Sequence, residues 1–144
     1  MSGNSSAPPA AAIQAALSAA ENVAAEASAP VVIVLTDAGG LVCGLLRMPG
    51  SFLASSDYAE WKAWTAASFS MSTLEFSDVL DSLGEEVKRG LLAHRKVTVL
   101  PGGVPVRVND TVIAAIGISG GPAEVDEACA AAARAAFLAA LECI

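Results

Sequence analysis

Apolar residues recur at helical spacing near both ends of the chain. Between Ala10 and Ser28 the apolar positions fall on one face and the polar positions on the other, which is the pattern of an amphipathic helix that packs on a core. Pro30 follows, and the residue before a proline is driven out of helical geometry. A second stripe predicts a helix after Pro122 that continues to the C-terminus; its apolar members are Val125, Cys129, Ala133, Phe137, Leu141 and Ile144.

Runs of β-branched and aliphatic residues predict five strands between these helices. Val31–Leu35 is apolar on both faces, so we expect a central strand that is covered on two sides. The turn chemistry of Asp37–Gly40 leads back into a second strand. The remaining strands are predicted from Val97, at Val104–Val108 and at Thr111–Ile118, the last two joined by a tight hairpin at Asn109–Asp110.

The segment between the second and third strands predicts a helical insert. Tyr58–Ala67 has the spacing of a helix, and a shorter helix follows before Gly84. The resulting order favours an α+β fold with five mostly antiparallel strands and the N- and C-terminal helices on one face. The insert or a partner subunit would cover the other face. We expect one domain over residues 10–144 after a flexible tail at residues 1–9.

Composition narrows the range of partners. Hydrophobic residues make up 54% of the chain, and much of this fraction is alanine. Alanine-rich helices pack closely on one another, so the apolar excess predicts a homo-oligomer whose subunit interface absorbs part of it. The net charge of −7 argues against nucleic acid as a partner, because phosphate-tracking surfaces are basic.

Cysteine usage and the N-terminal residues predict a cytoplasmic protein. Cys43, Cys129 and Cys143 are widely spaced, which suits a reducing compartment better than a disulfide framework. The N-terminus lacks the basic start and long apolar run of a secretory signal, and no apolar run is long enough to span a bilayer. With one histidine and scattered thiols, no metal site built from protein ligands is predicted.

One helix of the insert gathers the aromatic candidates for a binding site. Trp61 and Trp64 share a face, and Tyr58, Lys62 and Thr65 lie one step round from it. This set forms either a packing surface or a wall on which a flat ligand stacks. Burial would lower the pKa of Lys62 and make it a base, whereas a charged Lys62 would stabilise an oxyanion.

Two glycine turns near the same sheet predict a pocket, because glycine lets the backbone approach a ligand or another strand closely. Their members are Gly102 and Gly103 in the first turn, and Ser119, Gly120 and Gly121 in the second. Glu124 and Asp126 open the following helix. The helix dipole alone accounts for acidic residues there, but either one could act as an acid or base beside Lys62.

Two further cationic or titratable residues each allow two interpretations. Arg47 ends a predicted strand and is either a solvated charge or a ligand for an anion or carboxylate. His94 stands beside Arg95 and Lys96, a setting typical of a surface residue whose protonation is opposed by its neighbours. It is also the only imidazole available for proton transfer or an axial metal bond.

Five segments together resemble the GlcG/HbpS-like family of haem-degrading or haem-binding domains. They are Val34–Gly40, Arg47–Gly50, Lys62–Ala66, Leu100–Val106 and Ala115–Gly121, followed by Glu124 and Asp126–Ala128. The resemblance implies a profilin-like fold, a homo-oligomer, and a haem or cobalamin-related ligand that is often held between subunits. It does not imply a single activity. The segment from Met71 to Lys96 matches no motif of the family, so the resemblance does not support haem ligation through His94.

Three functions are consistent with these observations. The first is an oligomeric binding protein that holds haem or another flat small molecule between the aromatic helix and the glycine turns, with Arg47 and Lys62 on its carboxylates. The second is a cofactor-independent isomerase, lyase or cyclase for a small organic acid or secondary metabolite, with Lys62 and Asp126 or Glu124 as its polar groups. The third is an assembly subunit without chemistry of its own.

Overall fold

The computed structural model describes residues 7–144, so most of the predicted tail at residues 1–9 lies outside the described part, and Ala7–Pro9 have no regular secondary structure. Helices and strands follow one another along the chain in this order: α1 (Ala10–Glu26), β1 (Val32–Asp37), β2 (Val42–Arg47), α2 (Ser55–Phe69), α3 (Thr73–Ser82), α4 (Glu85–Leu92), β3 (Gly103–Val108), β4 (Thr111–Ser119) and α5 (Ala123–Glu142). The fold is α+β.

The strands form an antiparallel sheet in the order β2-β1-β4-β3. β1 is buried along its whole length, as the continuous apolar run predicts. β3 and β4 are joined by Asn109 and Asp110, whose φ angles are +52° and +65°. Two successive positive φ angles match the right-handed twist of a tight hairpin, and Asn and Asp tolerate this conformation.

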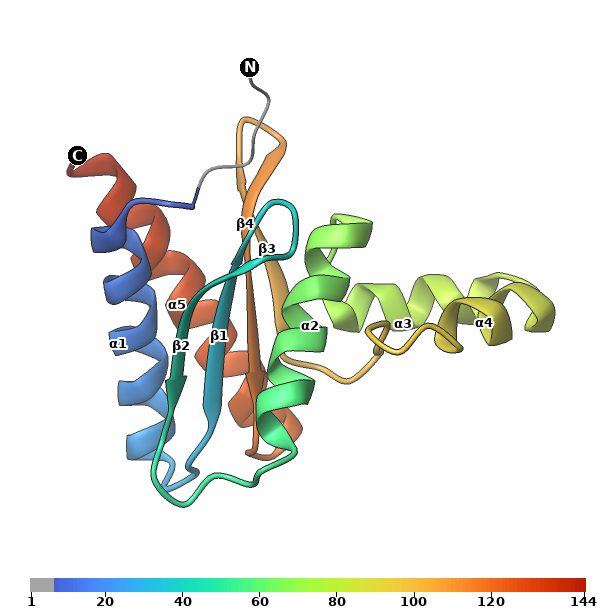
Figure 1. Cartoon of the computed structure of the whole chain (residues 1–144), viewed down its shortest axis with the longest axis horizontal. Coiled ribbons are helices and arrows are strands. Elements are labelled where there is room, and N and C mark those ends of the chain that lie inside the picture. The colour runs from blue at the N-terminus through green and yellow to red at the C-terminus, as the bar shows by residue number, and fades with distance from the viewer. Residues whose placement is uncertain (1–6) are drawn as a thin grey trace.

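The sheet lies between two helical layers (Figure 1). On one face α1 and α5 pack side by side, and a core of small and branched side chains joins them to the sheet. On the other face α2 packs through Ala59, Ala63 and Ala66 against Val32 and Val34. Alternate residues of β1 therefore enter different cores, because successive side chains of a strand point to opposite faces.

The expected fifth strand is absent from the described residues, and the sheet has four strands. Val97–Leu100 has no regular secondary structure and pairs with no strand. Its backbone is held by side-chain oxygens instead: the Thr98 N–H donates to Thr65 Oγ1 at 3.1 Å, and the Leu100 N–H donates to Thr98 Oγ1 at 3.2 Å. These hydrogen bonds satisfy two backbone N–H groups, which would otherwise need carbonyl oxygens of a neighbouring strand as acceptors.

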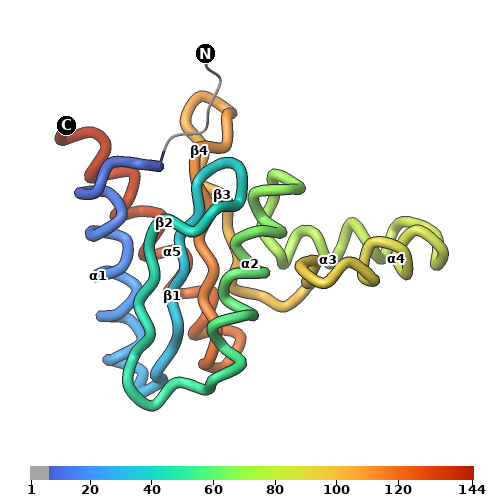
Figure 2. The backbone as a smooth tube through the Cα atoms, viewed as in Figure 1, coloured from blue at the N-terminus to red at the C-terminus, as the bar shows by residue number. Residues whose placement is uncertain are grey.

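Helices α3 and α4 extend away from the sheet (Figures 1 and 2). α3 is anchored near the sheet by a small apolar cluster that includes Phe76, Leu80 and Val97. α4 has no buried residue. Within residues 7–144 no helix is both long enough and apolar enough to cross a membrane.

Candidate functional site

Small residues let α2 lie directly on the sheet. Gly103 of β3 and Gly117 of β4 face each other in the antiparallel ladder. A Cβ at Gly117 would overlap the backbone of Ala59, and one at Gly103 would meet the Lys62 carbonyl oxygen at 2.5 Å. This close approach fixes the depth of Lys62, so its side chain runs between the helix and the end of β4.

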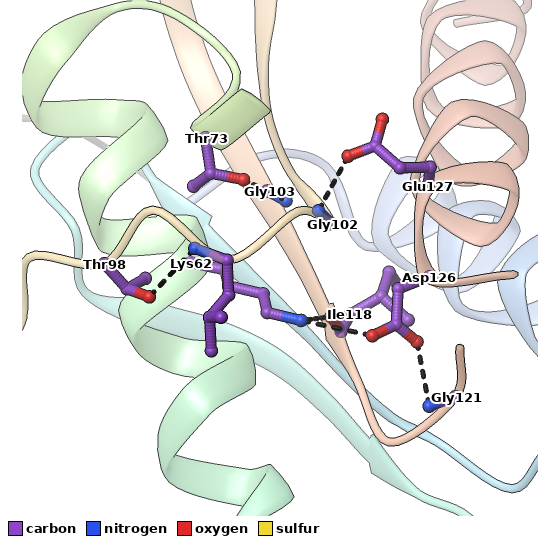
Figure 3. Close-up of polar contacts among 10 residues, drawn as sticks. Lys62, Thr73, Thr98, Gly102, Gly103, Ile118, Gly121, Asp126 and Glu127 are labelled. Carbon is purple, nitrogen blue, oxygen red and sulfur yellow. Dashed lines mark hydrogen bonds and ion pairs between the residues drawn. The ribbon is translucent and has the colours of Figure 1, made fainter. Parts of the chain in front are cut away.

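Lys62 forms a buried ion pair with Asp126, the fourth residue of α5 (Figure 3). The Lys62 ammonium donates to the Ile118 carbonyl oxygen at 2.6 Å and lies 3.2 Å from Asp126 Oδ2. The Gly121 N–H donates to Asp126 Oδ1 at 3.0 Å. The two side chains are only 4% and 6% exposed, so the pair is shielded from bulk water.

Burial pushes both members of the pair toward their neutral forms. It lowers the pKa of Lys62 below its usual value, although the negative charges of Asp126 and Glu127 oppose this shift. It raises the pKa of the Asp126 carboxyl group, against the opposing effects of Lys62 and the Gly121 amide. Desolvation disfavours charge on either group. The free-energy difference between the ion pair and the neutral pair, an amine beside a carboxylic acid, is therefore smaller than in water.

Gly102 lies directly over the ion pair. A Cβ there would meet Ile118 O at 2.7 Å and Lys62 Nζ at 3.2 Å, and its φ of +117° belongs to glycine's range. Its N–H donates to Glu127 Oε1 at 2.9 Å, as Figure 3 shows. The first glycine turn therefore approaches the site with its backbone, and Glu127 holds it in place.

A pocket of about 430 Å³ opens above the pair. It is lined by Phe52, Ala54, Ser55, Tyr58, Lys62, Leu100, Pro101, Ser119, Gly120, Gly121, Ala123 and Asp126. Phe52, Tyr58 and Leu100 are 71%, 39% and 45% exposed. The pocket thus has an apolar rim and a polar floor.

The structure gathers about half of the predicted site residues in this place. Tyr58, Lys62, Asp126 and the three residues of the second glycine turn line the pocket, and Gly102 covers the ion pair. Gly103 lies under α2, and its N–H donates to Thr73 Oγ1 at 3.1 Å. Glu124 is exposed and does not line the pocket.

The remaining aromatic and cationic candidates lie elsewhere. Trp61 makes an edge-to-face contact with Tyr58, with the ring centres 5.1 Å apart. Trp64 stacks on His94 with the ring centres 4.8 Å apart. Arg47 lines a second hollow together with the following residues 48–51 and Leu53.

Thr65, a predicted ligand-binding residue, does not line the pocket and makes structural hydrogen bonds instead. Its hydroxyl donates to the Lys96 carbonyl oxygen at 2.9 Å and accepts from the Thr98 N–H. It therefore holds the extended segment before the first glycine turn. His94 is exposed, and its Nδ1 accepts from the Lys96 N–H at 3.1 Å.

Several residues of the site were missed by the sequence analysis. Phe52 is an aromatic residue in a loop of glycine, serine and alanine, and this setting is the signal that could have identified it. Leu100 begins the family segment Leu100–Val106, which is the signal that could have identified it. Ser55 carries no comparable signal, because only the fold brings it to the pocket. Among residues 7–144 no group of three or more His, Cys, Asp or Glu side chains could hold a metal ion.

The comparisons with known proteins agree with one another. The family model described as haem-degrading protein HbpS-like matches residues 9–135. Over 121 residues the chain is 38% identical to the corrinoid adenosyltransferase PduO of Salmonella typhimurium; this match covers 83% of the chain but 35% of PduO. The chain therefore spans about a third of that relative.

Two crystal structures are similar over most of their length. A PduOC:haem complex superimposes with a TM-score of 0.82 and 32% sequence identity, covering 91% of this chain and 95% of the other. A double mutant of HbpS from Streptomyces reticuli gives a TM-score of 0.81 and 29% identity, covering 94% and 92%.

Proposed function

We propose, because this chain belongs to the HbpS-like family of haem-degrading proteins, that its pocket binds a flat and mostly apolar ring compound of the haem or tetrapyrrole type. The observation that supports this most directly is the apolar rim of Phe52, Tyr58 and Leu100 around a hollow of about 430 Å³. Hollows of this size, lined by aromatic and aliphatic groups, are typical of small-molecule sites. The similarity to a protein crystallised with haem supports the same class of ligand.

The side chains around the pocket fit the parts of a haem. Phe52 and Leu100 offer apolar contact for the ring faces. The Tyr58 hydroxyl is an oxygen ligand of a type that haem iron accepts. Arg47 does not line this pocket but a second hollow, where its guanidinium is available to a carboxylate.

Lys62 does not fit the role of carboxylate ligand that the sequence suggested. Its charge is balanced by Asp126, and Glu127 adds a further negative charge nearby. A carboxylate placed on this floor would face more negative than positive charge. Bound haem would supply one-electron and oxygen chemistry, whereas the residues of this chain would hold the ring and exclude water from one of its faces.

Titration of the purified protein with hemin tests the proposal. We expect a saturable shift of the Soret band, with Phe52→Ala weakening the affinity by about tenfold because an aromatic contact with the ring is lost. Tyr58→Phe should change the spectrum of the bound iron more than the affinity, since it removes the hydroxyl but keeps the ring.

Leu74→Ala provides the matched control. Leu74 is also a large exposed apolar residue, at 50%, but it lies on α3 and does not line the pocket. Its replacement should leave the titration unchanged. A titration that never saturates, or equal weakening by Phe52→Ala and Leu74→Ala, would show that hemin only adheres to exposed apolar surface and would refute the proposal.

A further inference from the structure

We propose that the Lys62–Asp126 pair is a proton-transfer site that converts a neutral apolar ketone into its enol. The geometric basis is a cationic acid and a carboxylate base 3.2 Å apart, both at the floor of one pocket. The inference needs the pocket to admit a small molecule, as in the proposed function, but it does not need that molecule to be haem.

Lys62 has a donor to spare for the ligand. An ammonium group carries three N–H donors, and two of them are used by Ile118 O and Asp126 Oδ2. The described residues offer the third donor no hydrogen-bond partner, and the Lys62 side chain lines the pocket. A carbonyl oxygen of a bound ligand would satisfy this buried donor, which otherwise costs free energy.

Asp126 is placed to act on the same ligand. The Gly121 N–H holds Oδ1, which fixes the orientation of the carboxylate, and Oδ2 faces Lys62. The position of Asp126 near the start of α5 favours its ionised form, because the helix dipole is positive there. A ligand whose carbonyl oxygen meets Lys62 would bring its neighbouring C–H bond toward Asp126.

The proton steps balance within the pair. Asp126 takes the proton from the carbon next to the carbonyl group, the C–H electrons form the C=C bond, and the carbonyl oxygen takes a proton from Lys62. Asp126 is then a neutral acid and Lys62 a neutral amine. Proton transfer across their contact restores the ion pair without a further reactant.

The charges of Lys62 and Asp126 at the bottom of the pocket, with Glu127 nearby, favour a neutral ligand. Burial lowers the pKa of Lys62 and raises that of Asp126, so the neutral pair left after enolisation is within reach. With Asp126 and Glu127 opposing a single Lys62, an anionic substrate is disfavoured. The site therefore suits a ketone without a carboxylate.

Deuterium exchange of 2-tetralone tests the inference. With wild-type protein in D₂O, proton NMR should show the signals of the hydrogens on the carbons next to the carbonyl group disappearing faster than in buffer alone. The rate of this loss should saturate with 2-tetralone concentration. Asp126→Asn should reduce this rate by about a hundredfold, the contribution expected of general acid–base catalysis. Asp81→Asn, which removes the exposed partner of Lys88, should leave the rate unchanged.

Wild-type protein alone can overturn the inference, so it does not depend on whether a variant folds. Exchange at the buffer rate, or exchange that does not saturate with 2-tetralone, refutes it. Competitive inhibition of the wild-type exchange by 2-naphthol, which has the shape of the enol, would support it. Saturable hemin binding without ketone exchange would overturn only this inference, whereas ketone exchange without saturable hemin binding would overturn only the proposed function.

Discussion

At the scale of single residues, transferring the charged side chains of Lys62 and Asp126 from water into the protein interior has a large desolvation cost. Both side chains are more than nine-tenths buried, and the Coulomb attraction of such a pair often does no more than offset the loss of hydration. A pair of this kind adds little to stability as a whole. Removing one partner is different, because it leaves an uncompensated buried charge.

A double-mutant cycle measures this asymmetry. We expect Lys62→Met and Asp126→Leu each to lower the free energy of unfolding by about 3–5 kcal/mol, and the double variant to lie within about 1 kcal/mol of wild type or above it. Urea denaturation of the four proteins gives the values. Additive losses in the double variant would contradict a coupled pair.

The free energy of unfolding of the wild type, relative to that of the double variant, should depend on pH because the pKa values of Asp126 and Lys62 are both shifted. The raised pKa of Asp126 means that the folded state keeps a proton at pH values above the ordinary carboxyl pKa of 3.8, so stability falls as pH rises through that window. The lowered pKa of Lys62 means that only the unfolded state keeps the lysine proton up to the ordinary pKa of 10.5, so stability rises with pH below that value.

Wild-type stability, measured relative to the double variant, should therefore have a minimum between these two windows. Using the difference removes the contribution of the other titrating groups, which the two proteins share. Urea denaturation across the pH range gives this difference, and a maximum near neutral pH would contradict the directions of both shifts.

The sequence predicted the members of the candidate site better than their exact contacts. Lys62, Asp126 and the glycine turns were named from residue type and from the family segments, and Glu124 or Asp126 was expected beside Lys62, but nothing local indicates which of the two carboxylates the lysine reaches. Trp64 and His94 show the same gap. Both were interpreted as separate candidates, whereas their rings stack on each other. Such contacts depend on the rotation and depth of a helix, which the sequence pattern does not determine.

At the scale of elements, the close contact between α2 and β4 depends on Gly117. In Gly117→Ala the new methyl group would overlap the Ala59 carbonyl oxygen and meet Ala63 N at 2.7 Å. We expect a loss of about 1–3 kcal/mol, the usual cost of overpacking, as α2 moves off the sheet. Urea denaturation measures it, and Gly90→Ala of α4 serves as the control: its added Cβ meets no atom of another element within 4 Å, so this change should not destabilise the protein.

Helix α3 begins with a capping box. Ser72 Oγ accepts from the Glu75 N–H at 3.1 Å, and Glu75 accepts from the Ser72 N–H at 3.2 Å. Ser72→Ala should destabilise this helix by about 1 kcal/mol, seen as faster amide hydrogen exchange in α3. Ser82→Ala is the matched control, since the Ser82 hydroxyl only donates to the Val79 carbonyl oxygen at the other end of the helix. Equal effects of the two changes would contradict a role for the cap.

The terminal helices and the hairpin between β3 and β4 were predictable because each is specified by nearby residues. The apolar stripes gave α1 and α5, and Asn109–Asp110 gave the hairpin between β3 and β4. The wrong fifth strand illustrates the opposite case. Val97–Leu100 has the composition of a strand, but the acceptor for Thr98 comes from Thr65 on another element. An extended segment with side-chain partners has the same local sequence as one with strand partners.

At the scale of the whole molecule, oligomerisation remains a prediction. Strand β2 and the residue before it expose apolar surface, with Leu41 at 70%, Val42 at 44% and Leu45 at 48%. The part of the chain that extends from the sheet adds Leu83, at the end of α3, at 39% and Val87 of α4 at 51%. A second copy that covered these groups would bury more apolar area than a monomer can.

Light scattering after size exclusion tests this prediction. We expect a mass that is a multiple of the 14.4 kDa of one chain, and Leu41→Ser together with Leu45→Ser should shift it toward a single chain if β2 lies in the interface. Glu86→Ser, on the solvated side of α4, serves as the control. A wild-type mass of one chain at micromolar concentration would rule out a stable homo-oligomer.

The ion pair also bears on how the chain folds. Lys62 and Asp126 lie 64 positions apart, and the Lys62–Ile118 hydrogen bond spans 56. Contacts of such separation form only after the entropy of closing a long loop has been lost. The two charges can meet only when α2 and α5 both lie on the sheet, so we expect the pair to form late in folding. Its contribution is then expected in the rate at which the native state opens, and hardly in the rate at which it forms.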